Sequence, residues 1–118
     1  KRIVADARCP RCKLEEEDCN HIFRECSTIK DVWRFIQLSW VLNNAQDTFW
    51  NWLTWVFSRG TTEQCRIFCC GLWTIWTNRN KLVYENRQTT ARDISYKISD
   101  FFAGLKGIEE KKLILANV

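Results

Sequence analysis

Methionine is absent from the sequence, which also holds only one histidine, one proline and four glycines among 118 residues. So few chain-breaking residues favour helices over a loop-rich or all-β fold. No apolar run approaches the roughly 18 to 20 residues that a membrane span needs, so we expect no membrane partner. Because Met is missing even at position 1, we expect a fragment of a longer protein. Its first residues are too charged for a signal peptide.

Aromatic residues are abundant, with 7 Trp and 7 Phe, and hydrophobic residues make up 46% of the chain. This composition excludes a disordered tail. A chain of this length forms one domain and can bury a core of its own. The net charge of +4 is modest, so charge alone does not identify a partner.

Seven cysteines fall into two groups, and their odd number argues against a secreted disulfide scaffold. We therefore expect a reducing, intracellular location, in the nucleus or the cytoplasm. The second group comprises Cys65, Cys69 and Cys70 within a predicted helix. Buried cysteines behave as small hydrophobic residues, and no histidine remains for a second metal site, so core packing is the interpretation we favour there.

The first group contains a metal-binding pattern, Cys-x2-Cys-x8-His-x4-Cys, formed by Cys9, Cys12, His21 and Cys26. Zinc prefers four thiolate or imidazole ligands in a tetrahedron. Two cysteines separated by two residues can reach one ion across a tight turn, and the His-x4-Cys pair closes the site. Because the protein fills all four positions, the pattern predicts one structural Zn²⁺ and no hydrolytic site.

Two alternatives to this ligand set remain open. Cys9 and Cys12 could form a redox pair, although such pairs usually lie in an α/β fold, which the helical pattern does not match. Cys19 could replace a ligand, but Cys19 with His21 leaves little chain to reach around one ion. We expect Cys19 to be a free thiol.

The predicted architecture is a small zinc-knuckle-like loop followed by helices. Residues 1–27 lack helical periodicity and hold the cysteine–histidine pattern, whereas apolar residues recur at helical spacing in residues 28–118. We expect a mainly α protein in which the loop packs with a bundle of about four helices as one domain. Side-chain caps mark three helix starts, at the pairs Thr28–Asp31, Thr61–Gln64 and Thr90–Asp93.

The second predicted helix begins at Asp47 or Thr48 and ends at Arg59–Gly60. Large rings cover most of its circumference, which fits either a deep core or an exposed patch. These rings are Trp50, Trp52, Trp55 and Phe57.

The third helix, extending to Glu85, has two apolar stripes, which predict a central helix with neighbours on more than one side. Gly71 costs this helix about 1 kcal/mol relative to Ala, so we expect it to permit a close crossing. In the fourth helix we expect fraying after Gly107. The two stripes are Phe68, Leu72 and Ile75, and Cys69, Trp73, Trp76 and Val83.

Several blocks carry a family resemblance: Lys1-Arg2-Ile3-Val4, Cys9-Pro10-Arg11-Cys12, Glu15-Glu16-Glu17-Asp18, His21-Ile22-Phe23, Glu25-Cys26 and Val32-Trp33. Together they resemble the zinc-binding region C-terminal to the reverse transcriptase of plant LINE-type (non-LTR) retrotransposons. A looser block, Leu72 to Lys81, resembles the helical segment that follows it. The resemblance covers roughly residues 1 to 90. It implies zinc binding, a retroelement origin and engagement of template nucleic acid.

Catalysis is not expected. Nucleotidyl transfer and RNase H chemistry require carboxylates that converge on two metal ions. The acidic run Glu15 to Asp18 would splay its side chains in different directions, and a solvated loop is its simplest interpretation. With His21 assigned to metal, no histidine remains for acid–base chemistry.

Two classes of function remain. In the first, which the resemblance favours, a zinc-structured module binds RNA or DNA through basic side chains and exposed rings. In the second, zinc is purely structural and an aromatic helical surface docks a protein partner or a second copy. The candidate nucleic-acid contacts are Arg8, Arg11, Lys13, Arg24, Arg79, Lys81 and Arg87.

Overall fold

The structure, a computed structural model, describes residues 7–44 and 48–116, with side chains described as far as Ile108. The block Lys1 to Val4 and the possible helix start Asp47 lie outside the described residues. The helical elements of the described part are η1 (His21–Glu25), a π-helix; α1 (Ser27–Phe35); η2 (Ser39–Asn44), a 3₁₀-helix; α2 (Phe49–Arg59); α3 (Thr62–Glu85); and α4 (Ala91–Ala116).

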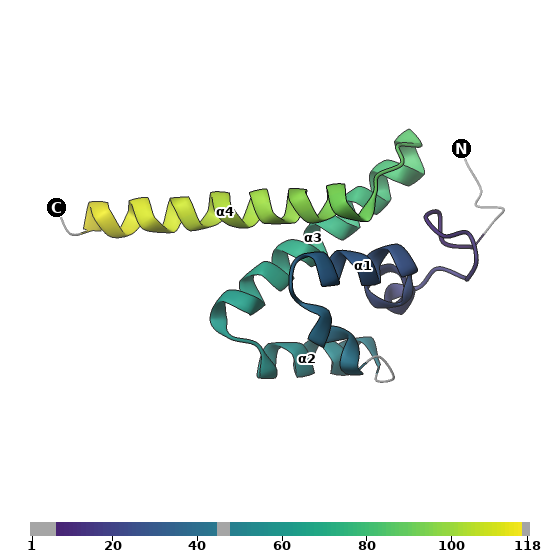
Figure 1. Cartoon of the computed structure of the whole chain (residues 1–118), viewed down its shortest axis with the longest axis horizontal. Helices are drawn as coiled ribbons and strands as arrows, with labels where there is room; N and C mark the ends of the chain where they lie inside the picture. The colour runs from purple at the N-terminus through teal and green to yellow at the C-terminus, as the bar shows by residue number, and fades with distance from the viewer. Residues whose placement is uncertain (1–6, 45–47, 117–118) are drawn as a thin grey trace.

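The mainly α class, with a Cys/His cluster near the N-terminus, is confirmed. Over the described ranges there is no named strand, and one isolated antiparallel bridge joins Arg8 and Glu16. α3 packs against α4 and η1, while α1 packs against α4, η1 and η2. In Figure 1, α1 lies between α4 and α2.

Three predicted helix starts are confirmed because local capping determines them. The hydroxyl oxygen of Thr48 accepts from the Asn51 N–H at 3.2 Å. Thr61 and Gln64 form the predicted reciprocal capping box at the start of α3. At α4, the hydroxyl of Thr90 accepts from the N–H of Asp93 at 3.1 Å.

The predicted cap at Thr28–Asp31 is wrong, because α1 begins one residue earlier, at Ser27, with Cys26 as its N-cap. Thr28 lies inside the first turn, and Asp31 pairs with Arg34 at 2.9 Å. Cys26 has an extended backbone (φ −62°, ψ 133°) and its carbonyl accepts the first helical bond, from Lys30. A metal-ligand candidate is therefore the N-cap residue of this helix.

The second predicted stripe of α3 is largely wrong, because Trp73 is 60% exposed and Cys69 and Trp76 are also exposed. The buried face instead includes small residues, which let neighbouring side chains approach the helix axis. Its members are Phe68, Cys70, Gly71, Thr74, Ile75, Asn78 and Leu82.

Aromatic rings join the first three α-helices into one core. The ring of Trp33 in α1 lies 5.1 Å from that of Phe68 in α3, and Trp52 in α2 lies 5.3 Å from the same ring. Trp52 also donates its indole N–H to the carbonyl of Val41 at 2.7 Å. Trp50 on the same helix is 74% exposed, so α2 supplies both a core ring and an exposed one.

Beyond Gly107, where we expect fraying, the backbone of α4 is helical to Ala116. Its first half is anchored by Ile94 and Ile98, which are fully buried. Its second half extends beyond the other helices as a straight arm (Figure 1). Of the helices described, none combines the length and apolarity that crossing a membrane requires.

Candidate metal centre

The four predicted ligands converge on one point. The sulfurs of Cys9 and Cys26 lie 3.9 Å apart, and the Cys12 sulfur lies 3.3 Å from Nε2 of His21. All four candidate ligand atoms lie within 4.8 Å of one another. A tetrahedral ion with bonds of about 2.0 to 2.3 Å separates its ligands by roughly 3.5 to 3.8 Å. The cluster can therefore hold one metal ion.

The first two ligands lie on a tight turn that closes on itself. The Lys13 N–H donates to the Cys9 carbonyl at 2.8 Å, and the Arg11 N–H donates to the Cys9 sulfur at 3.4 Å. Lys13 completes the turn in the left-handed region, with φ 59°. The Cys9 N–H then bonds back to the Glu15 carbonyl at 2.8 Å. These bonds direct both thiols to the same side of the loop.

The other two ligands bracket a single turn of π-helix, which sequence reasoning missed. The N–H of Cys26 donates to the carbonyl of His21 at 3.1 Å, the i+5 to i bond that defines this rare turn. Asp18 begins the turn by accepting from the His21 N–H at 2.8 Å. The His-x4-Cys spacing was the available signal, since the two ends of a π-turn are five positions apart.

Hydrogen bonding between two thiols polarises the cluster. The bond to Cys26, with burial second, raises the pKa of Cys9 to about 12. The same bond lowers the pKa of Cys26 to about 7; burial opposes this shift, and the N–H groups of Thr28 and Ile29 add to it. A metal ion bound here would displace the thiol protons, because metal ligation requires thiolates.

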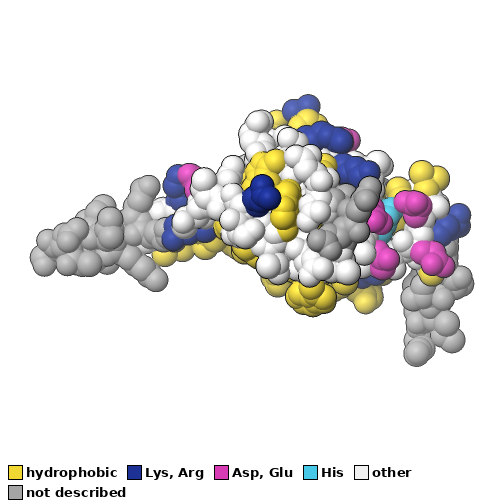
Figure 2. All heavy atoms as spheres, turned by 90° about the horizontal axis from the view of Figure 1, so that it is seen from below, with side chains coloured by type: hydrophobic (Ala, Val, Ile, Leu, Met, Phe, Trp, Pro, Cys, Tyr) yellow, Lys and Arg dark blue, Asp and Glu magenta, His cyan; other side chains and the backbone are white. Residues whose placement is uncertain are grey.

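A carboxylate from the acidic run lies near His21, although Nδ1 of this histidine has no hydrogen-bond partner among the described residues. The histidine is buried, and its Nδ1 lies 3.6 Å from Oε2 of Glu15 while Nε2 faces Cys12. A carboxylate beside the distal nitrogen is the usual arrangement for fixing the tautomer of a metal-binding histidine. Figure 2 shows the histidine beside acidic side chains.

The acidic run is mostly solvated, as predicted, because Glu15, Glu16 and Asp18 are exposed and only Glu17 is partly buried. As expected, its side chains do not converge, but three of them have distinct partners: Glu15 beside His21, Asp18 at the backbone of His21, and Glu17 against α3. These contacts are long-range or depend on the folded loop, so residue type alone did not reveal them.

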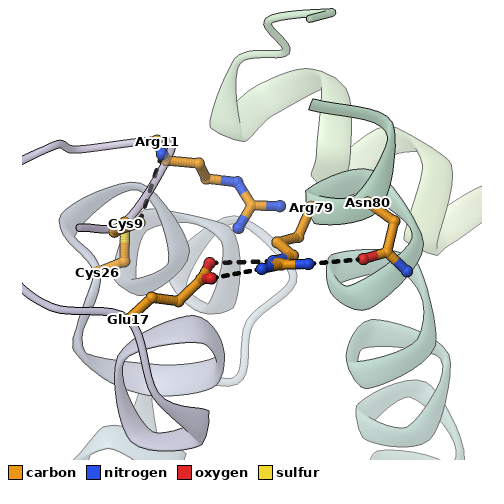
Figure 3. A network of polar contacts seen from close by, with 6 residues as sticks. All are labelled: Cys9, Arg11, Glu17, Cys26, Arg79 and Asn80. Carbon is orange, nitrogen blue, oxygen red and sulfur yellow. Dashed lines mark hydrogen bonds and ion pairs between the residues drawn. The ribbon is translucent and has the colours of Figure 1, made fainter. Parts of the chain in front are cut away.

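Two arginines connect the metal loop to α3 (Figure 3). Arg11 donates to the Ile75 carbonyl at 3.1 Å and to Oδ1 of Asn78 at 2.9 Å. Burial lowers the pKa of Arg11, and the nearby thiols of Cys26 and Cys9 oppose that shift. Arg79 grips both carboxylate oxygens of Glu17, and this contact raises the pKa of Arg79.

Arg24 belongs to the core, since only 1% of its surface is exposed. Its guanidinium lies 5.3 Å from the Trp52 ring centroid and donates to the side chain of Asn20 and the carbonyl of Asn44. It thereby joins η1 to α2 and η2. A predicted surface contact is in fact a buried structural cation.

The remaining candidate contacts are exposed and lie beside two cavities of about 410 Å³ each. Arg8 and Lys13 line the first cavity, together with Arg79, and Lys81 and Arg87 line the second. Gln88 borders both, so the cavities are adjacent. Five residues that were not among the predicted contacts also line the second cavity, including Tyr96, Lys97 and the acidic Asp93.

Cysteines outside the cluster occupy varied positions. Cys19 is exposed and does not belong to the cluster. Cys70 is buried, as the prediction of core packing requires, but Cys69 is exposed. The redox alternative has no α/β context in the described part of the chain, and the thiol of Cys9 bonds to Cys26.

Comparison of the chain with models of known protein families, with curated proteins and with solved structures finds no match.

Proposed function

We propose that this chain is a non-catalytic, zinc-structured module that binds nucleic acid, of the type that follows the reverse transcriptase in plant non-LTR retrotransposons. The observation that carries the proposal is the closed Cys9, Cys12, His21 and Cys26 cluster beside an exposed basic surface. Three thiols and an imidazole match the preference of zinc, and four protein ligands leave no position for a reactive water.

The charge around the cluster supports zinc. Three thiolates and a neutral imidazole around Zn²⁺ have a net charge of about −1, from the usual ligand charges. The guanidinium of Arg11, held against α3 by Ile75 and Asn78, supplies a nearby compensating charge. Zinc binding would supply folding energy to the segment from Ala7 to Asn20, which has no helix or named strand of its own until its last two residues.

Nucleic acid fits the surface formed by the two adjacent cavities. Lys81, Arg87 and Lys97 around one cavity can contact phosphates, and Arg8 and Lys13 extend the basic surface to the metal loop. Exposed tyrosines, Tyr84 and Tyr96, offer rings on which unpaired bases can stack. The folded loop presents its basic residues at low ordering cost.

Binding of zinc-loaded protein to single-stranded RNA and DNA at several salt concentrations tests this function. Each phosphate contact on a single strand adds about −0.7 to the slope of log affinity against log salt, so four or five contacts give about −3. Reversing Lys81 and Arg87 to Glu should weaken binding at least tenfold and flatten the slope, with zinc content unchanged. Arg59→Glu at the far end of α2 is the matched control and should change little.

The result that would overturn the proposal is binding that is undetectable, or insensitive to salt, in folded and zinc-loaded protein. In that case protein docking, the alternative function, becomes the better explanation.

A further inference from the structure

His21 presents its two ring nitrogens to different neighbours. Nε2 lies 3.3 Å from the sulfur of Cys12, on the side of the other ligands, whereas Nδ1 lies 3.6 Å from Oε2 of Glu15. Only 2% of the histidine surface is exposed, and Nδ1 bonds to nothing among the described residues. A neutral imidazole that ligates through Nε2 has its proton on Nδ1. Metal binding therefore leaves a buried N–H that needs an acceptor.

Glu15 can supply that acceptor because its backbone is fixed to the first ligand turn. The Cys9 N–H donates to the Glu15 carbonyl at 2.8 Å, and an antiparallel bridge joins Arg8 to Glu16. These contacts keep position 15 beside the cluster. The Glu15 side chain is 69% exposed, so little packing resists its movement. A hydrogen bond of about 3.2 Å needs a shift of about 0.4 Å from the observed 3.6 Å.

Other acids of the run are engaged elsewhere. Asp18 accepts from the backbone N–H of His21 at 2.8 Å, and Glu17 binds Arg79 through both carboxylate oxygens. Of the four acids in this described run, Glu15 is the one whose carboxylate pairs with the His21 ring. The acceptor for Nδ1 is therefore a single, identifiable side chain.

We propose that Glu15 is a positioning residue of the metal centre, whose carboxylate accepts the Nδ1–H of His21 when Nε2 binds the ion. The inference rests on the proposed zinc site and deepens it by adding a residue outside the four ligands. The bond fixes the orientation of the ring and holds the proton on Nδ1, so Nε2 stays available to the metal. Outer partners of this kind change metal affinity by about 10- to 100-fold, and the exposure of Glu15 places it at the lower end.

Zinc affinity of the 118-residue chain, measured by competition with a chromophoric chelator, tests the role of Glu15. Glu15→Ala should weaken zinc binding about tenfold, with helix content unchanged because the side chain is exposed. Glu16→Ala is the matched control, since it removes the same charge from the neighbouring exposed position. It should bind zinc as the unchanged chain does. Equal weakening by the two variants would show a general effect of charge and would overturn the proposal.

NMR of the His21 ring tests the bond itself. His21 is the only histidine in the chain, so its ring signals can be assigned directly. In zinc-loaded protein we expect a slowly exchanging Nδ1–H resonance that Glu16→Ala retains and Glu15→Ala loses. Glu15→Gln keeps an acceptor oxygen without the charge and should retain the resonance.

A resonance that persists in Glu15→Ala, or that Glu15→Gln loses, overturns the proposal. Zinc binding that ignores Glu15 overturns it too but leaves the proposed function standing. A chain that takes up no zinc overturns both.

Discussion

Gly71 faces a fully buried ring on the neighbouring helix. A Cβ built on it would lie 2.7 and 2.9 Å from two carbons of Trp33. The ring has little freedom to move, because its indole N–H donates to the carbonyl of Phe23 at 2.8 Å and Phe68 packs against it. We expect Gly71→Ala to lower the free energy of unfolding by about 1 to 3 kcal/mol, despite better helix propensity.

Denaturant unfolding measures this change, and Gly104→Ala on the exposed arm is the control. With open space around position 104, the added methyl should stabilise by up to about 1 kcal/mol. A more stable Gly71→Ala variant would show that α1 and α3 do not meet closely at this point.

Arg24 is a buried cation, and removing it should destabilise the fold. Its buried guanidinium has partners in Asn20, Asn44 and Trp52, so Arg24→Ala leaves those groups without their cation. We expect a loss of about 3 kcal/mol or more. Arg34→Ala, which breaks an exposed pair with Asp31, should cost less than about 1 kcal/mol. Similar unfolding midpoints for the two variants would contradict this assignment.

The sequence predicted the metal ligands but not the buried positions of two arginines. The ligand spacing indicated Cys9 and His21 correctly as neighbours, because a metal site constrains residue type and separation together. Arg11 and Arg24 resembled surface cations, since a basic residue beside a cysteine has the same appearance whether its side chain turns outward or inward. Their partners Asn78 and Trp52 lie far along the chain.

At the level of elements, the metal loop and the helices should respond differently to metal removal. The loop and η1 surround the cluster, whereas α3 and α4 pack through apolar side chains of their own. We expect a chelator to abolish amide protection in the loop, in η1 and at the start of α1, where Cys26 is the cap, while α3 stays protected. Hydrogen exchange of the zinc-loaded and chelated chain measures this difference.

Zinc binding should also depend on the ligand residues and on pH. Cys19→Ser should retain zinc, whereas His21→Ala should release it to a weaker chelator. Zinc affinity should fall as pH falls, because protons compete for the sulfurs, and the metal-free Cys9 thiol, with a pKa of about 12, binds its proton tightly. Zinc uptake that releases no proton at neutral pH would contradict a thiolate site.

Three helix starts could be predicted because their caps are local, whereas the start of α1 could not. The caps of α2, α3 and α4 depend on residues within three positions of each other, so Thr48, Thr61 and Thr90 could be identified from the sequence. α1 starts after Cys26, which makes no side-chain cap hydrogen bond and whose sulfur instead contacts that of Cys9 across the folded loop. Periodicity likewise showed that α3 has apolar faces, but not that Trp73 borders an open groove.

On the scale of the whole molecule, the basic and the apolar surfaces lie in different regions. The basic cavities adjoin the C-terminal part of α3 and the start of α4, whereas an apolar groove involves the start of α3 and the distal part of α4. The chain measures 58 Å along its longest axis. A ligand held at the basic cavities would therefore leave the apolar groove uncovered.

Asn78 connects the metal loop to the linker between α3 and α4. Its amide accepts from Arg11 on the metal loop and donates to Thr89, in the linker between α3 and α4, at 3.1 Å. Thr89 also lines the second basic cavity. If the chain binds nucleic acid as proposed, this side chain would connect the metal loop to the surface that holds the strand. We expect chelation to weaken strand binding more in the unchanged chain than in Asn78→Ala, as fluorescence anisotropy would measure.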